Sequence, residues 1–390
     1  MKSDFASALE RWYESHGRDL PWRHTSDPYL IMLSEFILQQ TQIVQGMDYY
    51  LRFAERFPVA KQLAEASEEE VLLLWQGLGY YSRARHLHSA AKQIAATGHF
   101  PKDYSFVRAL PGVGDYTAAA IMSFAFDEPY AVLDGNVQRV LARHFGISEP
   151  VDSTQGKKLL RALADEMLDR KHPALYNQAI MDFGALQCKP SAPVCQTCPL
   201  AETCQALSTH QVDKLPVKSK RTAVRDRYLT YIYTRTEDGQ TLLHRRGSGD
   251  IWQGLYEFPL IESDRPLTMK EVEDKVKDTL PSSLFTLHSI ARDVCHLLTH
   301  QRLHADFYCL TLPSFNSQFI IHNSQFTIHN SQLPIHLPRL QSRLGAKASK
   351  NYQLINESDL DSYALPRLLQ KLYAILLHKS ENNDNFATET

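Results

Sequence analysis

Four cysteines crowd into a short stretch of the chain and have the chemistry to bind a metal centre. They follow the spacing C-x6-C-x2-C-x5-C, at Cys188, Cys195, Cys198 and Cys204. Four thiolates on one short loop can converge on a compact iron–sulfur cluster. A single zinc ion is the alternative, but zinc ribbons usually carry two C-x-x-C knuckles and this loop has one. The spacing therefore favours a cluster.

A glycine-rich turn and an aspartate form a second candidate site. Two glycines let Leu110-Pro-Gly-Val-Gly114 turn tightly, and the helix that follows offers unpaired N–H groups to an anion such as a phosphate. An ordinary turn between helices is the alternative. Asp134 lies 20 residues after Gly114 and is expected to cap the helix that begins at Gly135.

An acid lies within an apolar helix in the segment Leu33-Ser-Glu-Phe-Ile-Leu-Gln-Gln-Thr-Gln42. Glu35 shares a helix face with Ile31 and Leu38. Apolar surroundings in a closed pocket raise the pKa of a carboxyl, which suits a general acid that works near neutral pH. For Glu35 by itself, an exposed position on the helix is the more favoured interpretation. The surrounding motif and the pairing with Asp134 instead favour a catalytic acid.

Together these motifs resemble the MutY-type adenine DNA glycosylases of the endonuclease III-like helix-hairpin-helix superfamily. The cysteine spacing resembles that superfamily's loop for a 4Fe-4S cluster, and Leu-Pro-Gly-Val-Gly with a later aspartate resembles its "GPD" signature. The resemblance implies removal of adenine opposite 8-oxoguanine or guanine in double-stranded DNA, during base excision repair. It also implies that Glu35 protonates the adenine and that Asp134 faces the sugar.

Tyr116 distinguishes two subclasses of this superfamily. Bifunctional relatives carry a lysine at this position, which attacks the sugar as an amine. A neutral phenol forms no Schiff base, so the resemblance implies a monofunctional enzyme in which Tyr116 helps to hold the sugar and Asp134. The other hypotheses are a pyrimidine glycosylase/lyase, a damage sensor that releases no base and, least favoured, a Nudix-type pyrophosphatase.

A base must be flipped out of the duplex before it can be cut. The resemblance implies that Leu78 and Tyr80 intercalate or stack, and that Arg83 and Arg85 meet phosphates. It assigns contacts with the base or the DNA to Trp22, Arg23, Gln40, Thr41, Leu78, Gly79, Tyr80, Gly112, Gly114, Asn136, Gln178, Thr299 and His300. In the family a Phe-Ser-His turn reads 8-oxoguanine; here Leu298 replaces its aromatic residue.

The chain is expected to be multidomain. A mostly α-helical helix-hairpin-helix domain with the iron–sulfur loop 188–204 spans residues 1–210, a basic linker spans 211–227, and an α+β Nudix-like domain spans 228–378. The linker's basic side chains could also lie along a phosphate backbone. The Nudix-like domain has the motif Trp252–Pro259 but lacks the glutamate run that holds magnesium, so it is expected to recognise the lesion partner.

Hydrophobic periodicity places the secondary structure. Helices are expected at about 68–75, 82–95, 116–125, 135–145 and 366–378, and strands at 228–234, 241–246 and 302–312. Cys295 and Cys309 are expected in the core.

A seven-residue unit repeats three times over residues 316–336. The sequence predicts a surface loop without fixed structure, with metal binding by His322, His329 and His336 as the alternative. The tail 379–390 is expected to be disordered.

Composition adds few constraints. The 390 residues are 43% hydrophobic and 22% charged, with a net charge of −2, which fits an ordinary globular protein with a local DNA-binding face. Neither a signal peptide nor a membrane span is expected. We therefore expect a cytoplasmic monomer with reduced thiols that works on the bacterial nucleoid.

Overall fold

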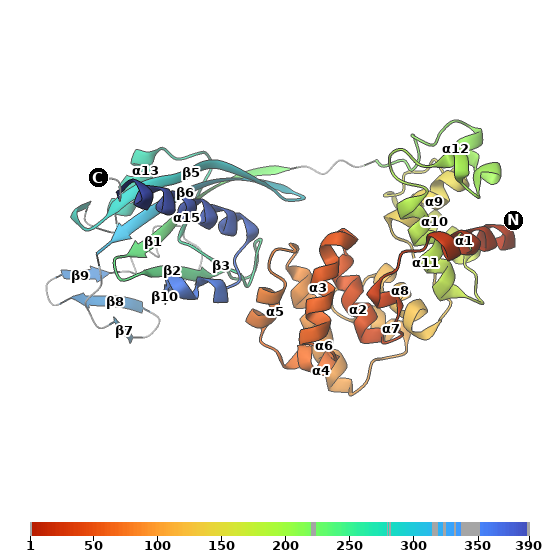
Figure 1. The fold of residues 1–390 in the computed structure, drawn as a ribbon, viewed down its shortest axis with the longest axis horizontal. Helices are drawn as coiled ribbons and strands as arrows, with labels where there is room; N and C mark the ends of the chain where they lie inside the picture. Colours follow the sequence, from red (N-terminus) through yellow and green to blue (C-terminus); the bar gives the residue numbers. More distant parts are fainter. Residues whose placement is uncertain are drawn as a thin grey trace. The chain divides into compact units, whose positions relative to one another are not determined.

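The computed structural model describes residues 2–219, 224–278, 280, 282–313, 319–322, 325–330, 333–336 and 352–387. The chain divides into two compact units (Figure 1). The first unit comprises Met1–Ala66 and Arg83–Arg221, and the second comprises Ser67–Ser82 and Thr222–Thr390. The division near residue 221 falls within the predicted linker, but the grouping of Ser67–Ser82 with the second unit was not predicted.

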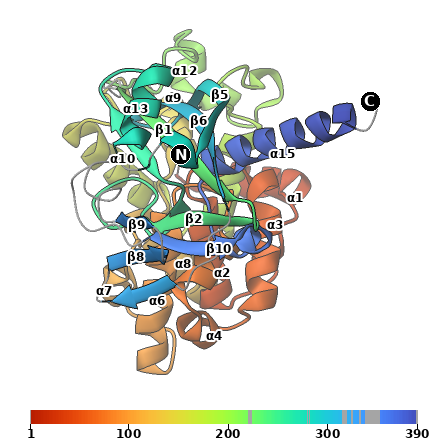
Figure 2. The same ribbon diagram turned by 90° about the vertical axis from the view of Figure 1, so that its left-hand side faces the viewer.

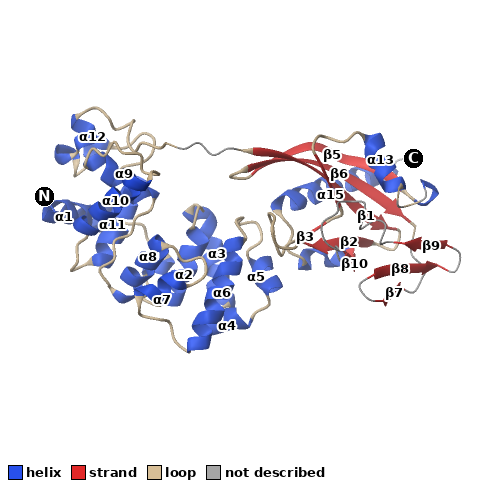
Figure 3. Cartoon of the chain, turned by 180° about the vertical axis from the view of Figure 1, so that it is seen from behind, coloured by secondary structure: helices blue, strands red, loops and turns tan. Residues whose placement is uncertain are grey.

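The first unit is helical (Figure 3). Its helices are α1 (Lys2–His16), α2 (Pro28–Leu38), α3 (Ile43–Arg56), α4 (Ala60–Glu65), α6 (Ser82–Thr97), α7 (Tyr104–Ala109), α8 (Asp115–Phe126), α9 (Gly135–His144), α10 (Thr154–Met167), α11 (Pro173–Leu186) and α12 (Gln205–Ser208). Short 3-10 turns are η1 (Pro21–Arg23), η2 (Cys195–Thr197) and η3 (Ala201–Thr203). The predicted helices near residues 82, 116 and 135 are confirmed.

Local signals explain where these helices begin and how they pack. Asp27 caps α2 by accepting a hydrogen bond from the Tyr29 N–H at 2.8 Å, and Pro28 occupies the first helical turn. Ala118, Ala119 and Ala120 of α8 are all buried, and such small side chains allow a close approach of α2, which packs on α8. Helix α11 packs against α1, α8 and α9.

The second unit contains two main sheets and the predicted helix α5 (Glu68–Leu74). In the larger sheet, of order β4-β1-β6-β5, β1 (Arg225–Thr236) pairs in parallel with β6 (Gln301–Leu312). Strands β4 (Leu260–Ser263) and β5 (Thr286–Leu297) pair antiparallel at the edges. The smaller sheet joins β10 (Tyr352–Asn356), β2 (Gln240–Arg245) and β3 (Tyr256–Glu257). The strands expected near residues 228, 241 and 302 are confirmed.

Alternating side chains bury both faces of the larger sheet. On one face Tyr233 and Phe307 pack against α15 (Arg367–Ala387), through Leu368 and Leu372. On the other face, residues that include Ile232 pack against α13 (Met269–Lys277), so the two helices lie on opposite sides of β1 and β6 (Figure 2). The predicted closing helix is thus confirmed, and the domain is α+β.

Two sequence-based expectations about secondary structure are wrong. The repeat forms an antiparallel sheet of β7 (Phe319–His322), β8 (Gln325–Asn330) and β9 (Leu333–His336), because its β-branched and aromatic residues favour strands that can pair with one another. The side chains of its three histidines lie outside the described residues, as does the metal-binding alternative that rests on them. Helix α15 continues to Ala387, through most of the tail expected to be disordered, because no glycine or proline ends it.

Cys309 is buried as expected, but Cys295 is exposed on the edge strand β5, so its assignment to the core is wrong. Among the described residues, no helix is both long and apolar enough to cross a bilayer.

Candidate active site

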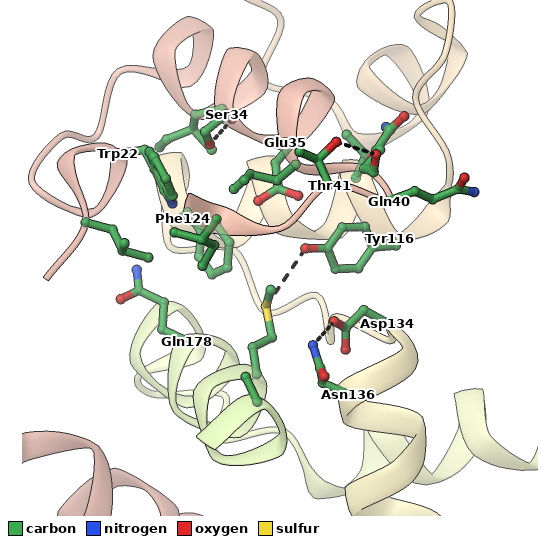
Figure 4. A pocket seen from close by; sticks show the side chains of 18 of the residues that line it. Trp22, Ser34, Glu35, Gln40, Thr41, Tyr116, Phe124, Asp134, Asn136 and Gln178 are labelled. Carbon is green, nitrogen blue, oxygen red and sulfur yellow. Dashed lines mark hydrogen bonds between the residues drawn. The ribbon is translucent and has the colours of Figure 1, made fainter. Parts of the chain in front are cut away.

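A cavity of about 900 Å³ opens in the first unit, and residues from η1, α2, α8, α9 and α11 line it (Figure 4). It brings together residues that lie far apart in the sequence. The predicted site residues in its lining are Trp22, Arg23, Glu35, Gln40, Thr41, Gly112, Gly114, Tyr116, Asp134, Asn136 and Gln178. The other predicted DNA-contacting residues, Leu78, Gly79, Tyr80, Thr299 and His300, lie in the second unit.

Glu35 projects from the apolar helix α2 and is only 6% exposed. Burial raises the pKa of its carboxyl to about 7, and the negative charge of Asp134 acts in the same direction. A hydrogen bond with Tyr116 and the charge of Arg23 oppose this shift. A substantial fraction of Glu35 is therefore protonated at neutral pH and able to donate a proton.

Asp134 is both the N-cap of α9 and part of the cavity wall. Its Oδ1 accepts from the backbone N–H of Val137 at 2.7 Å, and its Oδ2 accepts from Asn136 Nδ2 at 2.7 Å. Burial raises the pKa of Asp134, while these two hydrogen bonds lower it. The cap therefore holds a largely desolvated carboxylate in a fixed orientation toward the cavity.

Tyr116 lies close to both acids (Figure 4). Burial, followed by the charges of Glu35 and Asp134, raises the pKa of its phenol well above the usual value. Its hydroxyl lies 4.0 Å from Met181 Sδ on α11. The phenol is therefore a neutral hydrogen-bond donor.

Gly112 has to be a glycine. Its φ is +78°, in the left-handed region, and a Cβ atom there would lie 2.6 Å from His86 Cβ and 2.7 Å from Phe36 Cε1. The turn before α8 therefore packs tightly against α2 and α6.

Arg18 and Asp182, which the sequence analysis missed, support the wall that carries Arg23. Arg23 donates to both carboxylate oxygens of Asp182 at 2.7 Å, and Arg18 Nε donates to Oδ1 at 2.9 Å. Burial alone would raise the pKa of Asp182, but the hydrogen bonds from Arg23 and Arg18 outweigh it and hold the pKa below its usual value. Part of the Arg23 guanidinium therefore donates to the protein itself, and fewer of its N–H groups can donate to a ligand. The only feature of the sequence that could have pointed to Asp182 is its position one helical turn after Gln178, which places both on the same face of a helix.

Replacing Asp182 with alanine should destabilise the fold by about 3–5 kcal/mol, because it leaves Arg23 buried without its partner. Chemical denaturation of the full chain would measure the loss. The matched control is Glu65→Ala, which removes an exposed i,i+4 pair with Lys61 and should cost about 1 kcal/mol or less. Equal losses in the two variants would contradict the structural role of Asp182.

Gln178 is oriented by α1. The hydroxyl of Tyr13 donates to Gln178 Oε1 at 2.8 Å. Because the side-chain oxygen of Gln178 already accepts this hydrogen bond, its amide N–H groups remain able to donate to a ligand.

Arg83 does not face phosphate, and that prediction is wrong. Its side chain is buried and donates to the carbonyls of Phe36 at 3.1 Å and Ile37 at 2.8 Å, and to Thr41 Oγ1 at 3.1 Å. These carbonyls lie in the last turn of α2, where no helical N–H satisfies them. Arg83 therefore caps the helix that carries Glu35.

In the second unit, the turn between β5 and β6 exposes Thr299 and His300. The hydroxyl of Tyr80, a residue 48% exposed, lies 2.6 Å from Thr299 Oγ1. Leu78, in contrast, is buried. The structure thus pairs two predicted DNA-contacting residues that are 219 positions apart.

The four loop cysteines line a small cavity of about 30 Å³ and form no disulfide. All four belong to the described residues, and no three of their sulfurs lie within 4.8 Å of one another. A single zinc ion would bring its four sulfurs to about 3.8 Å from each other. Arg143 Nη1 lies 3.5 Å from Cys188 Sγ and can offset the negative charge of a thiolate centre. The four thiols and Arg143 thus form a site whose residues fit a thiolate-bound metal centre.

Two family models match the chain. Residues 33–166 match the HhH-GPD superfamily of base excision DNA repair proteins, and residues 230–374 match the NUDIX domain. The chain is 38% identical to the adenine DNA glycosylase of Mus musculus over 67% of this chain and 52% of that protein, so it spans about half of the mouse enzyme's length. It is 34% identical to the adenine DNA glycosylase of Buchnera aphidicola, over 65% of this chain and 73% of that protein.

A solved thermostable thymine-DNA glycosylase is 29% identical, with a TM-score of 0.50 over 53% of this chain and 97% of the other. Fold and site thus define a helix-hairpin-helix DNA glycosylase of base excision repair, followed by a Nudix-like domain. At 31% identity over 75% of this chain and 85% of a second Buchnera aphidicola enzyme, the similarity extends across both domains. The chain belongs to the family of adenine DNA glycosylases, enzymes that hydrolyse N-glycosyl bonds.

Proposed function

We propose that this protein excises adenine mispaired with 8-oxoguanine, and with guanine, from double-stranded DNA, and that it leaves the strand intact. The observation that carries the proposal is that one cavity is lined by both Glu35, which is partly protonated at neutral pH, and the fixed carboxylate of Asp134. The names of the relatives support the choice of adenine.

The proposed mechanism begins with an adenosine flipped into the cavity. Glu35 donates its proton to the imidazole ring of adenine, and the N-glycosidic bond breaks with its electron pair leaving on the base. Asp134, held by Val137 and Asn136, stabilises the cationic sugar or traps it briefly. Water then adds to the sugar carbon, and Glu35 accepts a proton from it. An abasic site and free adenine result.

The cysteine loop would hold a 4Fe-4S cluster through Cys188, Cys195, Cys198 and Cys204. When bound, such a cluster cross-links a loop that has little regular structure of its own. The spread of the sulfurs and the nearby Arg143 support this assignment.

The turn at Thr299 and His300 is proposed to inspect the base opposite adenine, together with Tyr80. All three residues lie in the second unit and are exposed, and a hydroxyl and an imidazole can hydrogen-bond to a base edge. Because Leu298 takes the place of the family's aromatic residue, hydrogen bonding rather than stacking would carry this recognition.

A glycosylase assay tests the proposal. We expect the holoprotein to release adenine from duplexes with 8-oxoguanine or guanine opposite it, and to give no covalent adduct with borohydride, because Tyr116 is a phenol. Release of an oxidised pyrimidine with borohydride trapping would point instead to a glycosylase/lyase. Tight binding without any base release would point to a damage sensor.

A further inference from the structure

Three potential metal ligands meet on the first unit, outside the cavity. Glu10 of α1, Asp169 in the segment after α10 and His172 at the start of α11 each present a ligand atom, and these atoms lie within 4.8 Å of one another. His172 Nδ1 lies 3.0 Å from Asp169 Oδ2. Neither the family models nor the relatives' names account for this cluster.

The interior side of the cluster has polar atoms without partners. Glu10 Oε1 is buried and makes no hydrogen bond, and the hydroxyl of the buried Tyr176 makes none either. Burial raises the pKa of the Tyr176 phenol most, and the charges of Glu10 and Asp169 raise it further. Tyr176 therefore lies close to both carboxyls. Leaving a buried polar group unsatisfied costs about 1–3 kcal/mol, so a ligand bound at this point would recover that free energy.

Two carboxyls this close repel one another unless they share a proton or a cation. The imidazole of His172, an exposed residue, lies 3.0 Å from one of them, at Asp169 Oδ2. A divalent cation held between the three groups would neutralise both acids.

We propose that Glu10, Asp169 and His172 bind a zinc ion, with the phenol of Tyr176 as a further oxygen donor or as a partner of a ligand. Two carboxylate oxygens and one imidazole nitrogen form a donor set that zinc accepts, whereas magnesium and calcium prefer oxygen alone. Zinc holds such ligands at about 2.0–2.2 Å, which places the ligand atoms about 3.3–3.6 Å apart, so any pair near the 4.8 Å limit must draw closer. His172, exposed at a helix start, can make that movement.

The site would join α1 to the N-terminus of α11. Tyr13 lies nearly one turn after Glu10 on α1 and orients Gln178 of α11, which lines the active cavity. A metal at this point would therefore fix α1 against α11, the helix that carries Gln178 into the cavity wall. The role is structural and does not depend on which base the enzyme removes.

Equilibrium dialysis of the iron-loaded full chain against micromolar zinc, with both metals quantified by mass spectrometry, tests the proposal. We expect one zinc per chain with the iron content unchanged, and a higher midpoint of thermal unfolding. His172→Asn and Glu10→Gln should each raise the zinc Kd by about tenfold or more and remove the thermal shift. His172 is exposed, so its substitution should leave the fold intact.

His24→Asn is the matched control. His24 pairs with Asp19 on the same unit, but both are exposed, and among the described residues no third ligand joins them. This variant should bind zinc as the parent chain does. Zinc uptake that is unchanged in His172→Asn, or that occurs only as iron is lost, would overturn the assignment.

Discussion

The Glu35→Gln variant is expected to bind lesion duplex as the parent chain does, but to release adenine about 10⁴-fold more slowly, at the upper end for loss of a general acid. The amide keeps the shape of the side chain but has no proton to give to the leaving base. Single-turnover release of adenine opposite 8-oxoguanine measures the rate, and a gel-shift titration measures binding. Glu55→Gln, an exposed change on α3, is the control and should excise normally.

The pH dependence of the parent chain gives an independent test of Glu35. Because the folded-state pKa is about 7, above the usual 4.5, the acid is protonated below pH 7 and loses its proton above it. The rate constant for excision should therefore fall as pH rises through 7, and the residual rate of Glu35→Gln should lack this step.

Stability follows the same linkage. Because the pKa of Glu35 is about 7 in the folded state and 4.5 as the ordinary value, the stability that the carboxyl contributes falls as pH rises from about 4.5 to 7 and is lost in full above pH 7. Glu35→Gln should therefore be no less stable than the parent at pH 8. A parent-like excision rate in Glu35→Gln would refute the assignment of Glu35 as the acid. If Glu35→Gln were less stable than the parent chain, its slower excision could come from partial unfolding instead of the lost proton donor.

Asp134→Asn should slow excision by about 10²–10³-fold, because a neutral amide no longer stabilises the positive charge that develops on the sugar. The amide oxygen can still accept from the backbone N–H of Val137, so the cap on α9 persists, but the amide N–H group cannot accept from Asn136 Nδ2. The free energy of unfolding should fall by about 1–3 kcal/mol, the cost of leaving the Asn136 donor unsatisfied. Single-turnover excision and chemical denaturation measure the two effects separately.

Asp103→Asn is the matched control for Asp134→Asn. Asp103 caps α7 by accepting from the backbone N–H of Phe106 at 3.0 Å, and it lies outside the lining of the cavity. The same chemical change there should leave excision unaltered. If both variants excised at the parent rate, Asp134 would be a helix cap and nothing more.

The sequence by itself determined the elements and the residue types of the candidate site. Asp134 predicted the start of α9, and hydrophobic periodicity predicted β1 and β6, because caps and periodicity act over a few residues. Glu35, Tyr116 and Asp134 were recognisable because short motifs surround them. Their roles remain predictions, but their choice required no tertiary information.

Only the tertiary structure decided which partners these elements meet. Arg23 and Asp182 are 159 positions apart, Tyr80 and Thr299 are 219 apart, and no local pattern connects either pair. The sequence also could not predict that Arg83 is buried at the end of α2. An arginine that follows a glycine-rich segment fits a phosphate contact equally well, so its type and position do not distinguish the two roles. The pKa of Glu35 depends on desolvation by several helices at once, and that is a property of packing rather than of sequence.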